Sequence, residues 1–239
     1  NGDEVLDYQH DLVHLMGWDV PVVAVAGPEQ VDRLIVPGQG FGLGALAQGT
    51  APYRAAVAAR FAKDIVPQGP EKLYISRSAL PSGRGGLVGE RQLETALEAE
   101  GFAIYHPQKH SVTHQIATYK AAKQIIAAEG SALHLVAMVA KQSQDIAVLV
   151  RRPSGATRNI ETHIRSFSGK APTMVFELKC SWKPSATVKP RTWRGERDIP
   201  AVQAGLAAAG FVPAKGEQWS SLTPDAVRSE LGPGFEKVP

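Results

Sequence analysis

From Lys72 to Cys180 the chain alternates short apolar runs with longer segments whose apolar residues recur at helical spacing. Strands that alternate with helices belong side by side in a parallel sheet, because each helix carries the chain back across that sheet. Such crossovers are right-handed and place helices on both faces of the sheet. We therefore expect a Rossmann-like α/β fold. Its strands are expected at 72–77, 102–105, 124–128, 145–150 and 173–180, and its helices at 89–100, 112–122, 131–140 and 157–167.

The residues before Lys72 form a smaller unit. A helical pattern over 4–16 ends at Gly17, and Gly69 with Pro70 interrupts the chain again, so we place a domain boundary near residue 68. Between them we expect strands at 20–26 and 31–36, a glycine-rich segment at 37–50 and a helix at 52–65. The expected organisation is a partial N-terminal α/β domain (1–68), a Rossmann-like domain (69–182), and a linker with C-terminal helices at 201–209 and 224–231 that pack back on both (183–239).

The composition of the 239 residues is that of an ordinary globular protein, with 44% hydrophobic residues and a formal net charge of +3. The basic residues are dispersed, except at Arg151 with Arg152 and at 189–197, which indicates a solvated basic face or attraction to phosphate and gives no reason to expect a nucleic-acid partner. Cys180 is the single cysteine and lies in an apolar run, so we expect a packed thiol in a reducing compartment. Without an apolar run long enough for a membrane span, the chain is expected to be cytoplasmic.

Two arginines follow the first strand of the Rossmann-like pattern. The apolar run 73–75 leads to Ser76 and Arg77 at the carboxyl end of the strand, where open α/β sheets hold their ligands. Arg84 lies in the glycine-rich loop that follows, and Glu90 opens the next helix. Guanidinium groups match phosphate oxygens with two parallel hydrogen bonds. This order favours a phosphate-bearing ligand, although a surface salt bridge between these arginines and Glu90 or Glu94 is the alternative.

A similar layout recurs after the strand at 124–128. Glu129, Gly130 and Ser131 follow it directly and precede a helix, whose N-terminus favours an anion. Gln115 follows a turn and either hydrogen-bonds a ligand or bridges the backbone at the start of its helix. His134 comes one helical turn after Gly130, where a histidine packed on an apolar helix is the simpler interpretation.

Two other motifs match weakly. Gly40, Gly42 and Ala45 repeat the dinucleotide-binding pattern in outline, with Asp64 near the expected offset, but Pro37 interrupts the junction between strand and loop. A flexible loop is therefore preferred to an NAD site. The sequence HDLVH, with His10 and His14, imitates a zinc-hydrolase motif but has no evident third ligand.

The ordered set of motifs resembles the glycosyltransferase 61 family, a former domain of unknown function that includes capsular-polysaccharide transferases. The chain departs from the family pattern at Gly89, which replaces an Asn, and at Glu129, which replaces a His. The resemblance covers about two-thirds of the chain. The matching residues are Ser76, Arg77, Arg84, Glu90, Gly101, Phe102, Gln115, Ile116, Gly130, Ser131 and Leu133.

The resemblance implies an inverting, metal-independent transferase of the GT-B kind that needs no cofactor and moves a sugar from a nucleoside diphosphate, expected to be UDP, to a glycan or glycolipid acceptor. The expected setting is bacterial capsular or extracellular polysaccharide synthesis, with peripheral association at the inner membrane. Residues 69–182 would hold the donor and 1–68 the acceptor. Donor-binding residues are then Arg77, Arg84, Glu90, Gln115, Gly130 and Ser131.

Glu129 is the expected catalytic base, with His10 and His14 as the other candidates. Because the chain begins at Asn1 without Met, we expect an upstream part to be missing, and the base to lie there if none of these residues serves. A noncatalytic nucleotide- or glycan-binding module is the rival hypothesis, and an NAD-dependent oxidoreductase is a third.

Overall fold

The computed structural model describes residues 4–152, 154–185 and 189–238 and contains two sheets. The larger sheet has five strands, every neighbouring pair of which is parallel. Their order across the sheet is β3 (Ala103–Tyr105), β1 (Lys72–Ile75), β4 (Gln124–Ala128), β5 (Asp145–Leu149) and β6 (Thr173–Val175). The Rossmann-like parallel sheet expected from the sequence is therefore confirmed.

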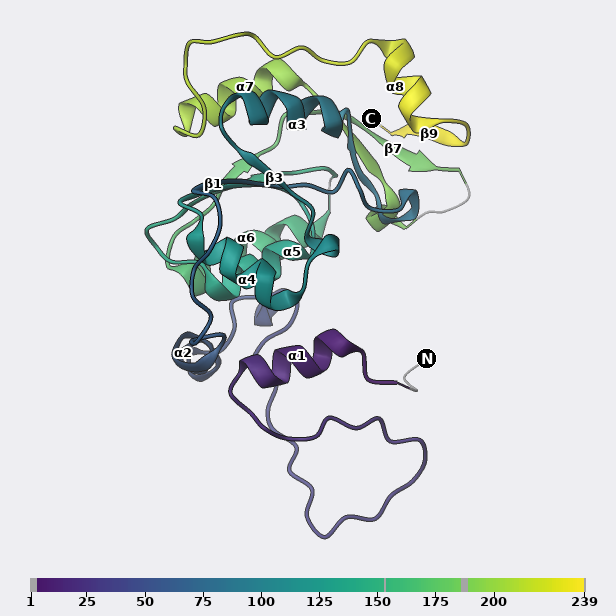
Figure 1. Cartoon of the computed structure of the whole chain (residues 1–239). Coiled ribbons are helices and arrows are strands. Elements are labelled where there is room, and N and C mark those ends of the chain that lie inside the picture. Colours follow the sequence, from purple (N-terminus) through teal and green to yellow (C-terminus); the bar gives the residue numbers. More distant parts are fainter. Residues whose placement is uncertain (1–3, 153, 186–188, 239) are drawn as a thin grey trace.

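Helices cover both faces of this sheet (Figure 1). On one face lie α4 (Val112–Ala121), α5 (Ala132–Val139) and α6 (Gly155–Ser168), and on the other lie α3 (Glu90–Ala99) and α7 (Ile199–Ala208). The two larger clusters of buried apolar residues lie one on each side of this sheet. Strand residues contribute to the two clusters alternately, as Leu73 and Ile75 face α4 and α5 whereas Tyr74 faces α3. Burial on both faces explains why these strands are apolar throughout.

The order of the strands fixes where a ligand can bind. Numbered within this sheet alone, the strands run 2-1-3-4-5, so the winding direction reverses between β1 and β4. In open α/β sheets the crevice for ligands opens beyond the carboxyl ends of the two strands at this switch point. The residues that follow β1 and β4, which begin with Ser76 and Glu129, therefore meet at the expected binding edge.

The second sheet has four strands, which the sequence analysis did not anticipate as a sheet. Its order is β2 (Gly86–Val88), β8 (Arg194–Arg197), β7 (Leu178–Pro184) and β9 (Phe235–Val238). Helix α8 (Pro224–Leu231) packs against it through Val227 and Leu231. The segment 183–200, expected to be a linker, holds β8 in the interior of this sheet. The strand expected at 173–180 is also divided, because β6 belongs to the first sheet and β7 to the second.

Buried Arg197 of β8 connects the two sheets. Its guanidinium donates hydrogen bonds to the carbonyl oxygens of Val150 and Val175, the second at 3.0 Å, and both residues belong to the carboxyl edge of the first sheet. Burial lowers the pKa of Arg197 to about 10, and the nearby Glu177 carboxylate opposes this shift. The guanidinium therefore stays charged near neutral pH and fixes the second sheet at the carboxyl ends of β5 and β6.

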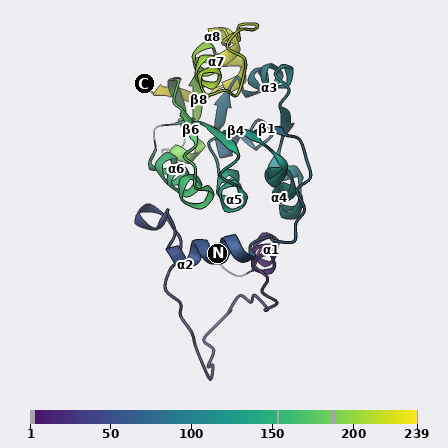
Figure 2. The same cartoon turned by 90° about the vertical axis from the view of Figure 1, so that its left-hand side faces the viewer.

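The described N-terminal residues 4–68 contain helices α1 (Asp7–Leu15) and α2 (Ala51–Arg60) and the short 3₁₀ helix η1 (Gly44–Leu46). The strands expected at 20–26 and 31–36 are wrong, because these residues run as an irregular loop that extends away from the helices (Figure 2). Apolar periodicity alone cannot make a strand where no neighbouring strand pairs with it. Apolar side chains remain exposed there, among them Val23, Leu34 and Val36.

Candidate functional site

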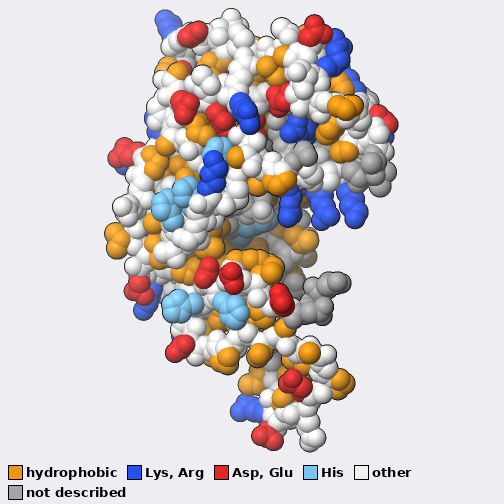
Figure 3. Space-filling view, turned by 45° about the vertical axis from the view of Figure 1, so that its right-hand side comes forward, with side chains coloured by type: hydrophobic (Ala, Val, Ile, Leu, Met, Phe, Trp, Pro, Cys, Tyr) orange, Lys and Arg blue, Asp and Glu red, His pale blue; other side chains and the backbone are white. Residues whose placement is uncertain are grey.

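A cleft of about 830 Å³ opens at the carboxyl ends of β1, β4 and β5. It lies at the switch point of the sheet, as the strand order requires. Among the described residues that line it are Arg77, Arg84, Arg151, Arg152 and Arg191. In the space-filling view, Lys and Arg side chains lie side by side at mid-height of one face of the molecule (Figure 3). The cleft is thus suited to a ligand with more than one negative charge.

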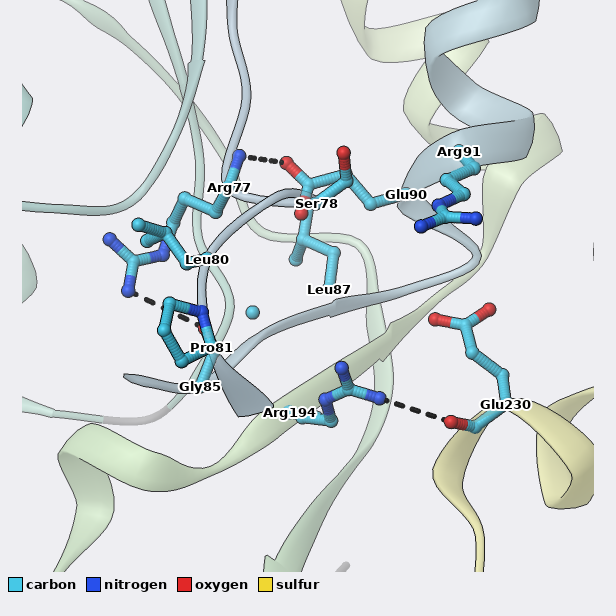
Figure 4. A pocket seen from close by; sticks show the side chains of 11 residues that line it. Arg77, Ser78, Leu80, Pro81, Gly85, Leu87, Glu90, Arg91, Arg194 and Glu230 are labelled. Carbon is cyan, nitrogen blue, oxygen red and sulfur yellow. Dashed lines mark hydrogen bonds between the residues drawn. The ribbon is translucent and has the colours of Figure 1, made fainter. Parts of the chain in front are cut away.

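Arg77 leaves the end of β1 and is held at both ends of its side chain. Its backbone N–H donates to Oε1 of Glu90 at 2.8 Å, and Nη2 donates to the carbonyl oxygen of Gly85 at 3.4 Å (Figure 4). Nη2 also donates to the carbonyl oxygen of Arg84 at 2.8 Å. Desolvation by burial lowers the pKa of Arg77, while the Glu90 carboxylate acts in the opposite direction. The guanidinium is therefore positioned before any ligand binds, which reduces the entropy that binding must overcome.

Glu90 is buried and accepts a hydrogen bond from the backbone N–H of Arg77. Its Oε1 atom accepts hydrogen bonds from Tyr74 Oη at 2.9 Å, from Ser76 Oγ at 3.3 Å and from the Arg77 backbone. Burial raises the pKa of Glu90, and its hydrogen bonds oppose that shift. The side chain lines a smaller hollow of about 270 Å³ on the other side of Arg77, together with Arg194 (Figure 4). This geometry favours a supporting role for Glu90 over direct contact with a ligand in the cleft.

Gly130 provides the space that the Arg77 side chain occupies. A Cβ atom on Gly130 would lie 2.5 Å from Nη1 of Arg77, inside van der Waals contact. The next residue, Ser131, begins α5 without a side-chain cap hydrogen bond to any described residue, and its hydroxyl lines the cleft. The structure therefore brings Arg77, Gly130 and Ser131 together, as the sequence pattern predicts.

Replacing Gly130 with alanine is expected to displace the Arg77 guanidinium while leaving the fold intact, because the methyl group meets only the flexible end of a side chain. We expect a change in unfolding free energy of under about 1 kcal/mol and an anion affinity about tenfold lower. Thermal unfolding and a titration with UDP measure the two effects. Gly155→Ala is the matched control, since a Cβ there meets nothing within 4 Å; equal UDP affinities in the two variants would contradict the prediction.

Glu129 lines the cleft with its side chain only 1% exposed. Its carboxylate accepts hydrogen bonds from Arg152 Nε at 3.2 Å, from Thr157 Oγ1 at 3.3 Å and from the Arg151 backbone N–H at 3.3 Å. A carboxylate so engaged holds the two arginines at the rim of the cleft. Its expected role as catalytic base stays a prediction, and its contacts favour a positioning role.

Arg151 follows β5 and reaches from the first sheet to the segment just before β8. Its Nε donates to the Glu129 carbonyl oxygen at 3.1 Å, and its Nη1 donates to the Trp193 carbonyl oxygen at 2.9 Å. Nη2 donates to the carbonyl oxygen of Arg191 at 3.3 Å. Burial, together with the positive charges of Arg152 and Arg77, lowers the pKa of Arg151 to about 9. Arg151 thus adds positive charge to the cleft while its hydrogen bonds are satisfied by the protein.

Other candidates lie elsewhere. Gln115 is not among the described residues that line the cleft, because its Nε2 donates to the carbonyl oxygens of Pro107 at 2.9 Å and His110 at 3.1 Å. Gln108, in the 3₁₀ helix η3 (Pro107–Lys109), lines the cleft in its place. The dinucleotide-like glycines fall in an irregular segment, where a Cβ on Gly40 would lie 2.9 Å from the Tyr53 ring. His10 and His14 lie on α1, on the far side of α4 and α5 from the sheet (Figure 1), and are not among the described residues that line the cleft.

Arg151, Arg152 and Arg191 line the cleft but were not predicted from the sequence as site residues. A signal was present for the first two, which follow directly after the strand 145–150 as Arg77 follows the strand 72–77. The rule that ligands bind at the carboxyl ends of parallel strands applies equally to both strands. Arg191 reaches the cleft only through the second sheet, so no local pattern indicates it.

A sequence profile described as Glycosyltransferase 61 matches residues 8–146, which contain β1, β4 and the arginine loop between β1 and β2. The match spans more than half of the chain. The chain belongs to the glycosyltransferase 61 family. It is accordingly a glycosyltransferase, and as such it binds a sugar donor and an acceptor. A search among curated proteins gives no match. Within the described part of this family member, no helix is both long enough and apolar enough to cross a membrane.

Proposed function

We propose that this glycosyltransferase 61 protein moves a sugar from a nucleoside diphosphate, with uridine as the base, to a glycan or glycolipid acceptor. The observation that carries the proposal is the arginine-lined cleft at the switch point of the parallel sheet. Its size falls within the range of about 300–1,000 Å³ that is usual for small-molecule sites. Arg77 and Arg84 would bind the diphosphate, with Gly130 and Ser131 receiving its oxygens at the start of α5.

The arginines also support a mechanism that needs no metal ion. When the bond between sugar and diphosphate breaks, negative charge grows on the departing phosphate oxygens. Positive groups fixed beforehand around that position stabilise the transition state, because they need no reorganisation during the reaction. Arg77, Arg84 and Arg152 line the cleft and would supply this charge. Inversion at the anomeric carbon follows if the acceptor oxygen attacks from the side opposite the diphosphate.

Glu90, Gln115 and Glu129 take supporting roles in this proposal. Glu90 fixes the Arg77 backbone, and Glu129 fixes Arg151 and Arg152. Gln115 fixes the turn that presents Gln108 to the cleft. The proposed setting is bacterial capsular or extracellular polysaccharide synthesis in the cytoplasm, where a glycolipid acceptor would bring the enzyme to the inner face of the membrane.

Thermal unfolding with a panel of ligands tests the donor class. A ligand that binds only the folded state raises its stability by RT ln(1 + [L]/Kd), which is about 2.7 kcal/mol at one hundred times Kd. UDP is expected to raise the melting temperature selectively over GDP, CMP and NAD. A selective response to GDP or CMP would exclude the uridine donor, a response to NAD alone would overturn the transferase site, and no response would contradict nucleotide binding by this cleft.

A further inference from the structure

A small pocket of about 150 Å³ lies next to the arginine-lined cleft. Its walls come from the N-terminal segment, through Phe41, Leu43 and Ala47, and from helices α5 and α6. His134 of α5 lines both the pocket and the cleft, so a ligand in one space is next to a ligand in the other. The proposed donor site uses none of the pocket's other residues. We refer to it as the Phe41 pocket.

The polar groups of the Phe41 pocket are unusual for so apolar a place. His134 and His163 face each other with their Nδ1 atoms 3.0 Å apart, and His163 is only 1% exposed. The Nε2 atom of His163 is buried and has no hydrogen-bond partner among the described residues. A buried nitrogen without a partner costs free energy, so its retention beside a cavity indicates a missing polar ligand.

The surroundings keep both imidazoles neutral. The rings of Phe41 and Phe167 pack against His163, with centroid distances of 4.4 Å and 4.5 Å. Desolvation lowers the pKa of His134, and desolvation with the neighbouring His134 lowers the pKa of His163 to about 3. On the cleft side, the charged groups that share its lining with His134 are Arg77, Arg84, Glu129, Arg151, Arg152 and Arg191.

Two neutral imidazoles joined through Nδ1 must differ in tautomer, because one donates its hydrogen and the other accepts it. If His134 is the donor, its Nε2 carries a free lone pair, whereas Nε2 of His163 carries a hydrogen into the pocket. The pair then offers a base at the edge of the cleft and a hydrogen-bond donor beside it. A hydroxyl group that lies between the two sites can use both.

We propose that the Phe41 pocket is the acceptor subsite of this transferase and that His134 is the base that deprotonates the acceptor hydroxyl. This inference rests on the proposed function. The acceptor oxygen forms its bond to the anomeric carbon as its proton passes to Nε2 of His134. The bond between that carbon and the diphosphate oxygen breaks, and its electron pair leaves with the diphosphate between the arginines. His163 Nε2 and the Phe41 ring hold a single sugar ring, since an apolar wall with a few polar groups suits a sugar.

The binding part of the proposal is tested with methyl β-glycosides of xylose, glucose, galactose, mannose and N-acetylglucosamine. Saturation-transfer NMR in the presence of UDP is expected to detect at least one of them. Phe41→Ala and His163→Asn are each expected to weaken that glycoside about tenfold and to change UDP affinity less than twofold. In His163→Asn, the side-chain amide takes the place of Nδ1 as a hydrogen-bonding partner for His134, but the variant lacks Nε2. His114→Asn, on the exposed side of α4, is the matched control.

The outcomes separate this inference from the donor proposal. If no glycoside binds, or if one binds equally well to the Phe41 and His163 variants, the acceptor subsite is overturned. If a glycoside binds and Phe41→Ala weakens it while UDP does not bind at all, the acceptor subsite is supported and the proposed uridine donor is overturned. Melting temperatures of the variants identify any that fail to fold, and Phe41→Leu replaces Phe41→Ala in that case.

The role of His134 is tested by the rate of transfer from a UDP-sugar to the glycoside that binds. His134→Ala is expected to lower kcat at least 100-fold with little change in donor KM, as for loss of a general base. Added imidazole is expected to restore part of the rate in His134→Ala but not in Arg77→Ala. A His134→Ala enzyme that keeps its rate overturns this role for His134, and so does a loss that imidazole does not rescue.

Discussion

Replacing Arg77 with alanine is expected to lower kcat by about 10²–10³, as for removal of a fixed group that stabilises charge in a transition state. The guanidinium is held by the carbonyl oxygen of Arg84 and lines the proposed diphosphate site, so the variant loses a charge that no neighbour can replace in the same position. Steady-state kinetics with a UDP-sugar measure the loss. UDP affinity is expected to fall as well, by about tenfold or more, because charged hydrogen bonds are worth about 1.5–3 kcal/mol.

The control for this variant is Arg165→Ala. Arg165 is exposed on α6 and pairs with Glu161 at 2.5 Å, so its removal changes the net charge equally without touching the cleft. Arg77→Lys separates charge from geometry, since a lysine retains the charge but lacks the planar fork. If Arg77→Ala transfers sugar at the wild-type rate, Arg77 is not part of the donor site.

Replacing Glu90 with alanine is expected to destabilise the fold by about 2–4 kcal/mol, because buried donors lose their acceptor. The Tyr74 hydroxyl and the Arg77 backbone N–H both depend on Oε1 of Glu90. Glu90→Gln, by contrast, keeps an oxygen at this position and all three hydrogen bonds. Chemical unfolding in urea measures both variants. If Glu90→Ala and Glu90→Gln lose equal amounts of unfolding free energy, the charge of Glu90 and not the hydrogen bonds that it accepts stabilises the fold.

The same pair of variants gives a pH dependence with a definite sign. Because burial raises the pKa of Glu90, the folded state holds this proton at pH values where the unfolded chain has released it. The unfolding free energy of the wild type therefore falls as pH rises from the unfolded-state pKa of Glu90 to its folded-state pKa. Above the folded-state pKa, this loss of stability stays constant. Glu90→Gln has no proton to lose. Its stability relative to wild type is expected to increase across the window, and a flat difference would contradict the raised pKa.

Much of the fold could be predicted because it depends on local patterns. Apolar runs such as 124–128 and 145–150 are buried on both faces, and their length and spacing leave few alternatives to a parallel sheet. The second sheet could not be predicted in the same way. Its strand β8 is the sequence RGER, whose place depends on partners far away in the chain. The loop at 18–36 shows the opposite error, because β-branched residues predicted strands that have no partner.

The site shows the same division. Arg77, Glu129, Gly130 and Ser131 follow strands directly, so the strand pattern placed them at one edge of the sheet before the structure was known. Gln115 lies near the cleft, as predicted, but its side chain points to the backbone of the preceding turn. The position of a residue within one helical turn decides which way its side chain points, and the sequence pattern did not resolve that position for Gln115. The pairing of His134 with His163 joins two helices across 29 residues of sequence, and periodicity carries no information on such a contact.

The two buried arginines that link the sheets have a consequence for how the molecule comes apart. Arg151 reaches from the first sheet to the carbonyl groups of Arg191 and Trp193, which lie just before β8, and Arg197 reaches back from β8 to the first sheet. Separating the sheets would break the hydrogen bonds of both guanidinium groups to these carbonyl oxygens, and any guanidinium that stayed buried without an acceptor would be strongly destabilising. The two sheets are therefore expected to unfold together as one cooperative unit. A fragment that stops after Trp182 would lack Arg197, and the guanidinium of its Arg151 would lack the carbonyl acceptors that lie just before β8.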